Sequence, residues 1–270
     1  MKKSGGGIYG FFDIKSVEFL SDFNILKVKE EYNNQITADD DFWNAKIDAN
    51  YGTLIYVKTA HMSKSYITYK RTGMDGWIIL KNIAPPYKIL FSGHICAGKS
   101  TLSKELAQKI GGTYIHFGTY IRKVLEQNNI LYSRTDMQEM GIELRNKLGD
   151  KGIIEQVTKE VAYTENSTLI FDGVRHIGVL EELRLKYPDI IHIHVSASQN
   201  DRYVRYITRD KKISRKEFKE IDSNEAEKEI DILASKADYV IHSNHNNDIK
   251  YESDIITNVL IYLISGRTIL

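Results

Sequence analysis

One short run of residues constrains the fold of this chain more than any other feature. Residues 93–100 read Gly-His-Ile-Cys-Ala-Gly-Lys-Ser, which fits the pattern G-x-x-x-x-G-K-[ST]. The apolar residues 89–91 precede it, as a buried strand should, and residues 101–107 follow it with helical spacing. Glycines let backbone N–H groups converge on a phosphate, and a helix N-terminus adds the positive end of its dipole. The sequence therefore predicts a phosphate-binding loop, or P-loop, between a strand and a helix of an α/β fold.

The loop carries side chains suited to a nucleoside triphosphate and a divalent cation. Lys99 is expected to neutralise the β- and γ-phosphates, Ser100 to ligate Mg²⁺ through its hydroxyl group, and Thr101 to contact the α-phosphate. The residues expected to bind ATP are Gly93, His94, Ile95, Cys96, Ala97, Gly98, Lys99, Ser100 and Thr101. Thiols at helix N-termini are often reactive, so Cys96 has either a regulatory redox role or that of an incidental small residue.

A change of pattern at Pro85 and Pro86 divides the chain into two expected domains. Residues 1–85 are rich in Tyr, Asp and Asn and predict a small β-rich or α+β domain of unknown role. Residues 86–270 alternate apolar runs with amphipathic stretches, which predicts a three-layer α/β/α fold with a five-stranded parallel sheet.

The expected elements follow from this alternation. Strands of the first domain are expected at residues 8–14, 53–58, 65–71 and 76–80, with a hairpin turn at 72–76 and an ambiguous segment, a short helix as one alternative, at 17–31. Strands of the second domain are expected at residues 88–92, 113–116, 168–172, 190–195 and 238–242. Its helices are expected at residues 99–110, 119–128, 136–147, 151–163, 179–187, 199–209, 214–234 and 254–264.

Charge and composition exclude several classes of protein. The chain has 37 Lys and Arg against 36 Asp and Glu, so it lacks the overall positive field of a duplex-DNA binder. The single cysteine cannot form an intramolecular disulfide, so nothing requires an oxidising compartment. No run approaches the length of a membrane span, and the N-terminus lacks the apolar stretch of a signal peptide. We therefore expect a cytoplasmic protein without membrane contact; the oligomeric state is not indicated.

A second apolar run ends in an acidic residue. Residues 168–171 are followed by Asp172, Gly173 and, after one residue, Arg175. Ligands of parallel sheets bind beyond the carboxyl ends of the strands, so Asp172 is expected beside the P-loop. There it can hold Mg²⁺ or accept a proton from an attacking oxygen, and the alternative is that it only caps the next helix. Arg175 is placed to meet a phosphate.

Basic side chains are concentrated further along the chain. They are Arg202, Arg205, Arg209, Lys211, Lys212, Arg215, Lys216 and Lys219. The first three are spaced to fall on one face of a helix. A solvated helix face is one alternative for this stretch, and a groove for single-stranded nucleic acid is another, although aromatic residues, Tyr203 and Tyr206 among them, are sparse in it.

Several motifs resemble those of the nucleoside monophosphate kinase-like group of P-loop kinases, over residues 88–264 and not over the first 85. Residues 115–122, Ile-His-Phe-Gly-Thr-Tyr-Ile-Arg, are similar to the adenylate kinase segment in which an arginine grips the acceptor phosphate. The resemblance implies that role for Arg122, although a threonine stands at position 119 where an aspartate is usual. The Asp-Gly-Val-Arg of residues 172–175 is closer to a mainly archaeal branch related to adenylate and dephospho-coenzyme A kinases. That branch also carries patterns like residues 140–145 and 237–241.

The resemblance also implies a lid. In these kinases a mobile segment carries arginines over the transferring phosphoryl group, where they stabilise the charge of the transition state. Arg205 and Arg209 match that segment, and Arg215 is expected to close from its far side. The implied fold class is that of a P-loop NTPase with a nucleoside monophosphate kinase-like sheet.

These features predict an enzyme that moves a phosphoryl group from ATP, with Mg²⁺, to a small phosphorylated acceptor such as a (deoxy)nucleoside monophosphate. The expected catalytic residues are Lys99, Asp172, Arg205 and Arg209, the metal ligands are Ser100 and Asp172, and the acceptor-binding residues are Arg122, Arg175 and Arg215. One alternative is a kinase of nucleic-acid ends or bases, although a nucleic-acid partner is not favoured. Another is a nucleotide-sensing regulator whose first 85 residues bind a partner.

Overall fold

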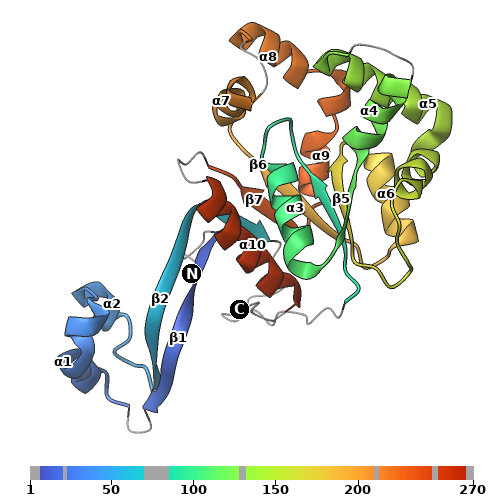
Figure 1. The fold of residues 1–270 in the computed structure, drawn as a ribbon. Helices are drawn as coiled ribbons and strands as arrows, with labels where there is room; N and C mark the ends of the chain where they lie inside the picture. The colour runs from blue at the N-terminus through green and yellow to red at the C-terminus, as the bar shows by residue number, and fades with distance from the viewer. Residues whose placement is uncertain are drawn as a thin grey trace. The chain divides into compact units, whose positions relative to one another are not determined.

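The computed structural model describes residues 7–20, 23–69, 85–127, 132–209, 213–244 and 249–265 (Figure 1). The chain forms two compact units. The smaller unit is Phe11–His61, and the larger unit, which contains the P-loop, comprises Met1–Gly10 and Met62–Leu270. The expected domain boundary at residues 85 and 86 stays a prediction.

The strands of the chain form one mixed sheet with a parallel centre, and the parallel strands all belong to the larger unit. The strands are β1 (Ile8–Leu20), β2 (Gly52–Tyr69), β3 (Lys88–Ser92), β4 (Thr113–His116), β5 (Leu169–Val174), β6 (Ile191–Ser196) and β7 (Tyr239–His242). Their order is β1-β2-β7-β6-β3-β5-β4, and β3 to β7 pair with one another in parallel. The predicted five-stranded parallel sheet and P-loop kinase-like fold are confirmed. In addition, β2 pairs antiparallel with β7 and places Ile67 opposite Ile241.

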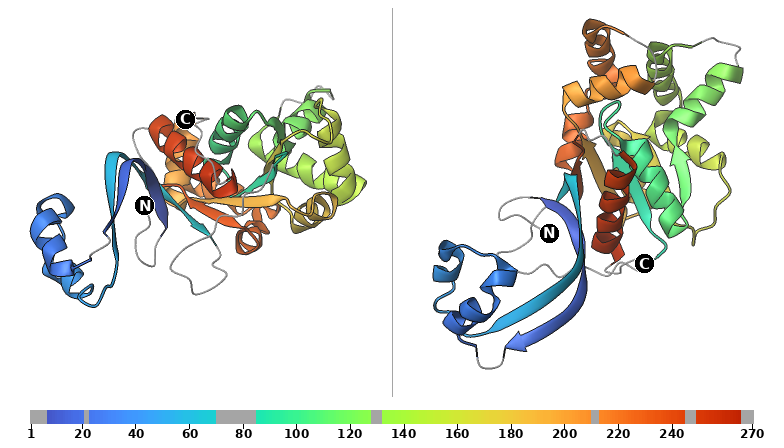
Figure 2. Two further views of the ribbon diagram at one scale, coloured as in Figure 1. Left: turned by 90° about the horizontal axis from the view of Figure 1, so that it is seen from below. Right: turned by 60° about the vertical axis from the view of Figure 1, so that its left-hand side comes forward.

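Helices cover both faces of this sheet. They are α3 (Lys99–Ile110), α4 (Phe117–Gln127), α5 (Arg134–Lys159), α6 (Ile177–Lys186), α7 (Gln199–Arg209), α8 (Arg215–Asp222), the 3-10 turn η1 (Glu225–Glu227), α9 (Ile230–Ser235) and α10 (Ile249–Ser265). Helices α3 and α10 pack together on one face, and α6 and α9 lie on the other (Figure 2).

Three expected helices differ from the structure. Those expected at 136–147 and 151–163 fall in one element, α5, which ends at Lys159 and has a kink at Gly149, where φ is 71°. Glycine adopts this left-handed conformation without steric cost, so the chain turns there and resumes the helix. The single helix expected at 214–234 is wrong, because α8, η1 and α9 replace it.

The core explains why the P-loop stands where it does. Strand β3 is buried on both faces, and Ile89, Leu90 and Phe91 are all fully buried. Leu90 packs with Phe171 of β5 and Leu183 of α6 in the main apolar cluster. A continuous apolar run is what a central parallel strand requires, and its carboxyl end delivers the chain directly into the loop.

The smaller unit has little apolar core. Its helices are α1 (Ile25–Ile36) and α2 (Asp40–Asn44), and Asn24 caps α1 by accepting hydrogen bonds from the backbone N–H groups of Leu26 and Lys27. Trp43 is its only buried large apolar side chain among the described residues, and its indole N–H donates to Asn33 Oδ1 at 2.8 Å.

Several expectations for the first 85 residues need correction. The ambiguous segment 17–31 is strand as far as Leu20 and helix from Ile25. The strands expected at 53–58 and 65–71 are parts of the single strand β2. The strand expected at 76–80 and the turn at 72–76 lie outside the described residues. In the parts of the chain that the structure describes, every helix falls short of what a membrane crossing needs.

Candidate functional site

The P-loop joins β3 to α3 at the carboxyl edge of the parallel strands. Gly93 and Gly98 have φ values of 139° and 105°, which few residues other than glycine adopt. A Cβ at position 93 would also collide with the main-chain carbonyl of Val195. Glycine at 93 is therefore required by space as well as by conformation. Ile95, at the tip of the loop, is buried against Tyr206 of α7.

Lys99 is the first residue of α3 and is almost fully buried. Its Nζ donates a hydrogen bond to the main-chain oxygen of His94 at 2.7 Å, within the loop itself. Burial, and then the positive charge of Arg175, lower the pKa of Lys99 to about 7. A bound polyanion would restore the charge of this ammonium group, so the site is chemically prepared for phosphate.

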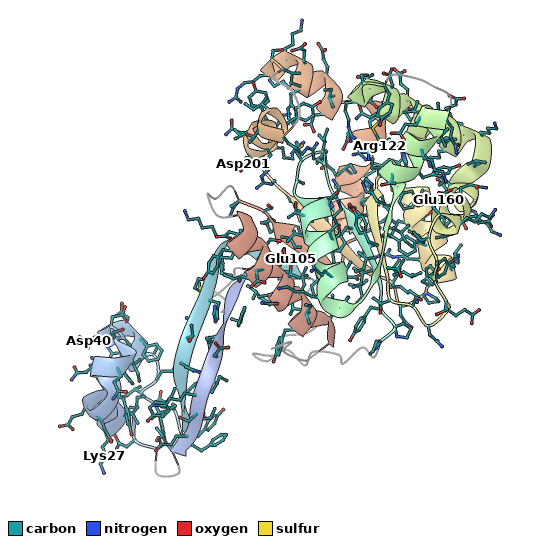
Figure 3. The ribbon with its side chains drawn as sticks, in the orientation of Figure 1. Lys27, Asp40, Glu105, Arg122, Glu160 and Asp201 are labelled. Carbon is teal, nitrogen blue, oxygen red and sulfur yellow. The ribbon has the colours of Figure 1, made fainter. Side chains whose placement is uncertain are left out.

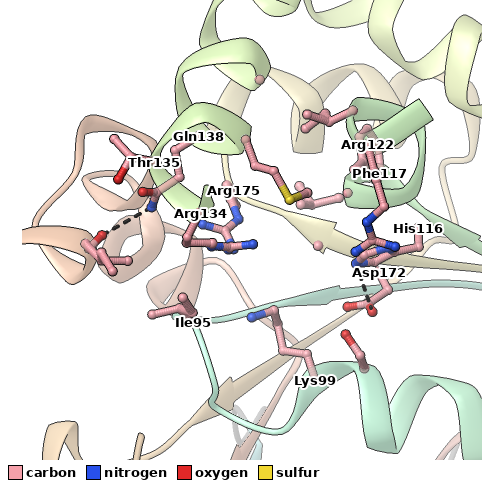
Figure 4. A pocket seen from close by; sticks show the side chains of 18 of the residues that line it. Ile95, Lys99, His116, Phe117, Arg122, Arg134, Thr135, Gln138, Asp172 and Arg175 are labelled. Carbon is pink, nitrogen blue, oxygen red and sulfur yellow. Dashed lines mark hydrogen bonds and ion pairs between the residues drawn. The ribbon is translucent and has the colours of Figure 1, made fainter. Parts of the chain in front are cut away.

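Asp172 lies on β5 and is fully buried beside the loop (Figure 4). Tyr114 of β4 donates its hydroxyl hydrogen to Oδ2 at 2.5 Å, and burial followed by the Asp172 charge raises the pKa of Tyr114. The other oxygen, Oδ1, is buried without a hydrogen-bond partner among the described residues. A buried carboxylate oxygen lacking a donor suits a cation or a substrate hydroxyl group. Asp172 does not cap the next helix, because His176 occupies the N-cap of α6.

A pocket of about 720 Å³ opens above Lys99 and Asp172. Its lining brings basic side chains together from several helices and from the end of β5. They are Arg122 of α4 (Figure 3), Arg134 and Arg145 of α5, Arg175, Arg209 of α7, and the histidines His116 and His176. Such a concentration of positive charge favours an anionic ligand, in a protein whose net charge is only +1.

Arg175 is held by a carboxylate that sequence analysis missed. Its guanidinium group forms an ion pair with Glu227 of η1, which is 3% exposed. Glu227 Oε2 also lies 3.7 Å from Nδ1 of His94 in the P-loop. Burial, and then the charge of Arg134, lower the pKa of Arg175 to about 9. Glu227 therefore links the loop to the arginine that faces the pocket.

Arg134 was also missed, although a sequence signal for it existed. Ser133 accepts a hydrogen bond from the backbone N–H of Asp136, and Asp136 accepts one from the backbone N–H of Ser133, which forms a capping box. The Ser-x-x-Asp pattern marks the start of α5 and puts Arg134 in its first turn. Arg134 lies beside Arg175 in the pocket (Figure 4), and its charge also lowers the pKa of Lys99.

The arginines of the expected lid have different surroundings. Arg205 donates to the main-chain oxygen of Ala97 at 3.0 Å and to that of Ser243 at 3.2 Å. Arg209 lines the large pocket as well as a smaller one described below. Arg215 donates to Asn200 Oδ1 at 2.9 Å, lies 4.7 Å above the Tyr203 ring, and lines neither pocket.

Arg202 points away from the pockets and is a structural residue. Its side chain is 6% exposed and forms an ion pair with Asp222 of α8, which is 8% exposed. Asp222→Ala is expected to destabilise the protein by about 3–5 kcal/mol, because it leaves a buried guanidinium group without its partner. Denaturant unfolding would measure this, with Glu220→Ala, an exposed site on the same helix, as the control. Equal stability of the two variants would contradict the assignment.

Three buried polar side chains form a cluster where β3 and β6 lie side by side. Ser92 Oγ is 2.7 Å from Nε2 of His192 and 2.9 Å from Nδ1 of His194. Burial, and then the charge of Lys99, lower the pKa of His194 to about 4. His194 therefore stays neutral over a range of pH in which an exposed histidine takes up a proton.

This cluster predicts a loss of stability in acid. Between pH 6.5 and about 4 the unfolded state binds a proton that folded His194 does not, so acid favours unfolding. The contribution of neutral His194 to the free energy of unfolding is fully present above pH 6.5. It falls by roughly 3 kcal/mol as the pH is lowered to about 4. Unfolding free energies of the wild type should fall more steeply over this interval than those of His194→Asn. If the unfolding free energies of the two proteins change equally with pH, His194 is not the source of the acid sensitivity.

The smaller pocket, of about 370 Å³, adjoins the end of the P-loop. Leu102, Ile241 and Ile256 give it apolar surface. Its polar lining residues are Ser65, Gly98, Lys99, Ser100, Thr101, Arg205, Thr208, Arg209, Ser243, Asn244, Glu252 and Ser253. Apolar walls with polar groups at the edge and a guanidinium group nearby suit a flat heterocycle.

The structure thus brings most of the predicted site residues together. The P-loop, Asp172, Arg122, Arg175, Arg205 and Arg209 line two adjoining pockets, whereas Arg215 lies apart. Cys96, the single cysteine of the chain, lines both pockets. Within the residues that the structure describes, no group of three His, Cys, Asp or Glu side chains is arranged to hold a metal ion.

Comparisons with known proteins found several similar chains. The chain is 28% identical to the UPF0200 protein of Saccharolobus solfataricus over 168 residues, which is 61% of this chain and 86% of that protein. Among solved structures it is similar to a shikimate kinase from Bacteroides thetaiotaomicron, with a TM-score of 0.39, 18% identity, and coverage of 66% of this chain and 97% of that one. It is also similar to a gluconokinase from Sinorhizobium meliloti, with a TM-score of 0.38, 11% identity, and coverage of 64% of this chain and 91% of that one.

The chain also matches the model of a protein family. A family described as an AAA domain matches residues 89–252. That range begins in β3, includes the P-loop, Asp172 and the arginines of both pockets, and ends in the first turn of α10. The chain therefore belongs to this AAA domain family of P-loop kinases.

Proposed function

We propose that this protein transfers the γ-phosphoryl group of ATP to a small phosphorylated acceptor, most readily a (deoxy)nucleoside monophosphate. One observation carries the proposal: Lys99, Asp172 and Arg175 come from separate parts of the chain and surround a single pocket. A P-loop supports the donor, and the basic lining of the large pocket supports an acceptor that already carries a phosphate.

The two pockets divide the substrates between them. The P-loop amides and Lys99 hold the donor phosphates, and the smaller pocket beside Thr101 takes the nucleoside. The larger pocket takes the acceptor, whose phosphate is bound by Arg122 and Arg175. A bidentate arginine fixes a phosphate in direction as well as in charge, which brings the acceptor oxygen into line with the γ-phosphorus.

Ser100 and Asp172 have the chemistry to hold Mg²⁺. The hydroxyl group and the unpartnered Oδ1 are both hard oxygen ligands, as this ion prefers. When bound, the ion would neutralise charge on the β- and γ-phosphates. The residues of this chain perform the rest: Asp172 can accept the proton of the attacking oxygen, while Arg205 and Arg209 offset the charge of the transferred group. A new P–O bond to the acceptor forms as the bond to the β-phosphate oxygen breaks.

A coupled ADP-release assay tests the proposal. Ribo- and deoxynucleoside monophosphates and dephospho-coenzyme A would be compared with the matching unphosphorylated nucleosides. At least one phosphorylated acceptor should raise ADP release above that with ATP alone, and its nucleoside should not. Arg122→Ala should raise the KM for that acceptor without changing the affinity for ADP. The proposal fails if no acceptor exceeds the rate with ATP alone.

The same assay separates the alternatives. Turnover with oligonucleotides, together with a salt-sensitive affinity for them, would indicate a nucleic-acid kinase. Tight ATP binding with negligible turnover would indicate a nucleotide-sensing regulator. A cytoplasmic location stays a prediction.

A further inference from the structure

One wall of the smaller pocket comes from a part of the chain outside the family match. The match begins at residue 89, yet Ser65 of β2 lines the pocket together with Asn244 and Glu252. The end of β2 reaches this position because it pairs with β7, where Tyr66 lies opposite His242. Asn244, which follows β7, therefore lies directly beside residues 64 and 65.

A buried carboxylate fastens this segment in place. Glu252, in the first turn of α10, is 8% exposed. Its side chain accepts hydrogen bonds from the backbone N–H groups of Lys64 at 2.9 Å and Ser65 at 3.3 Å, and from the hydroxyl group of Ser63. Hydrogen bonds to an ionised group are about twice as strong as neutral ones, so residues 63–65 are firmly held.

The same segment fixes the orientation of Asn244. The backbone N–H of Asn244 donates to Ser65 Oγ at 3.2 Å, and its side-chain Nδ2 donates to the main-chain oxygen of Lys64 at 2.7 Å. The bond to Lys64 uses one of the two hydrogens on the amide nitrogen, so Asn244 can offer a ligand a donor as well as its oxygen. Residues 63–65 thus fix the position of this amide.

The neighbouring groups connect this wall to the P-loop. Arg205 bridges the main-chain oxygens of Ser243 and Ala97, one residue before Asn244 and one before Gly98. Both carboxylate oxygens of Glu252 accept hydrogen bonds from residues 63–65, so this side chain holds the wall together. The amide of Asn244 is then the group of the wall best suited to meet a ligand edge that both donates and accepts hydrogen bonds.

We propose that residues 63–65 form part of the donor nucleoside site and, by fixing the amide of Asn244 there, contribute to its preference for the adenine base of ATP. The inference rests on the proposed function only in taking the donor to be a nucleotide on the P-loop. Ser65 and Glu252 are positioning residues that act through Asn244.

Binding of ADP, GDP and pyrophosphate to the full chain, followed by calorimetry without any acceptor, tests the idea. Wild type should prefer ADP to GDP. Ser65→Ala should weaken ADP binding by about 5-fold, and Glu252→Gln by about 10-fold, with a smaller ADP preference in each, as expected for lost hydrogen bonds. Pyrophosphate, which has no base, should bind all forms equally. Thr68→Ala, which removes a hydroxyl group from the same strand outside the pocket, is the control.

The outcomes are distinguishable. If wild type binds none of the three ligands, the proposed function itself fails. If ADP binds but Ser65→Ala and Glu252→Gln leave its affinity and preference unchanged, this inference is overturned while the function stands. Equal weakening of ADP and pyrophosphate would also overturn it, because that pattern indicates general damage to the loop and no recognition of the base.

Discussion

Lys99→Ala is expected to reduce phosphoryl transfer by about 10²–10³-fold, the usual effect of removing one group that stabilises transition-state charge. Lys99 is buried at the start of α3, and burial together with Arg175 keeps its pKa at about 7 in the free protein. An ammonium group with so little water around it is stabilised by bound phosphates. Its loss therefore affects both nucleotide affinity and the transfer step.

Steady-state kinetics and ADP binding would measure the two effects separately. Lys104→Ala is the matched control, because Lys104 is an exposed lysine on the same helix. It should retain turnover close to that of the wild type. Undiminished ATP affinity and full turnover in Lys99→Ala would contradict the assignment of residues 93–101 as a phosphate site, and with it the proposed function.

Asp172→Asn is expected to have the second largest effect, a fall in kcat of about 10²–10³-fold. The substitution keeps the shape of a fully buried side chain, so stability should change less than activity. It removes the charge that Oδ1 offers to a cation or to the proton of the acceptor. The concentration of Mg²⁺ needed for half-maximal rate should rise as well.

Tyr114→Phe provides the comparison for Asp172. It removes the hydroxyl group that donates to Oδ2 but keeps the carboxylate, so kcat should fall by no more than about 10-fold. Magnesium titrations of the three proteins would rank them. If Asp172→Asn retains more than a tenth of wild-type turnover with an unchanged magnesium requirement, Asp172 is not the acidic residue of the reaction.

Local signals explain why the P-loop and its flanking elements were predictable. A buried apolar strand, glycines at fixed positions and an amphipathic helix are all encoded within some twenty consecutive residues, and positive φ at Gly93 and Gly98 follows from the same segment. Asp172 was predictable because it ends a second apolar run, and parallel strands bring such ends together.

The residues that sequence analysis missed depend on distant parts of the chain. Glu227 is one acidic residue in a polar stretch, and only folding brings it to Arg175. Strand β2 was expected as two strands because the mostly polar residues 58–64 interrupt its apolar pattern. Its end is fixed by hydrogen bonds to Glu252, almost two hundred positions later in the chain. The long helix expected at 214–234 failed because continuous helical propensity was not opposed by any glycine or proline.

The pairing of β2 with β7 affects how this protein can be shortened. In a fragment beginning at residue 86, the amides and carbonyls of β7 that face β2 would lose their partners, and the sheet would gain an open edge. Open edges are templates for intermolecular strand addition, so such a fragment should be prone to aggregate even with its P-loop and Asp172 intact. Removal of Phe11–His61 alone, with a short turn in its place, keeps that edge covered and is the safer route to a shortened P-loop protein.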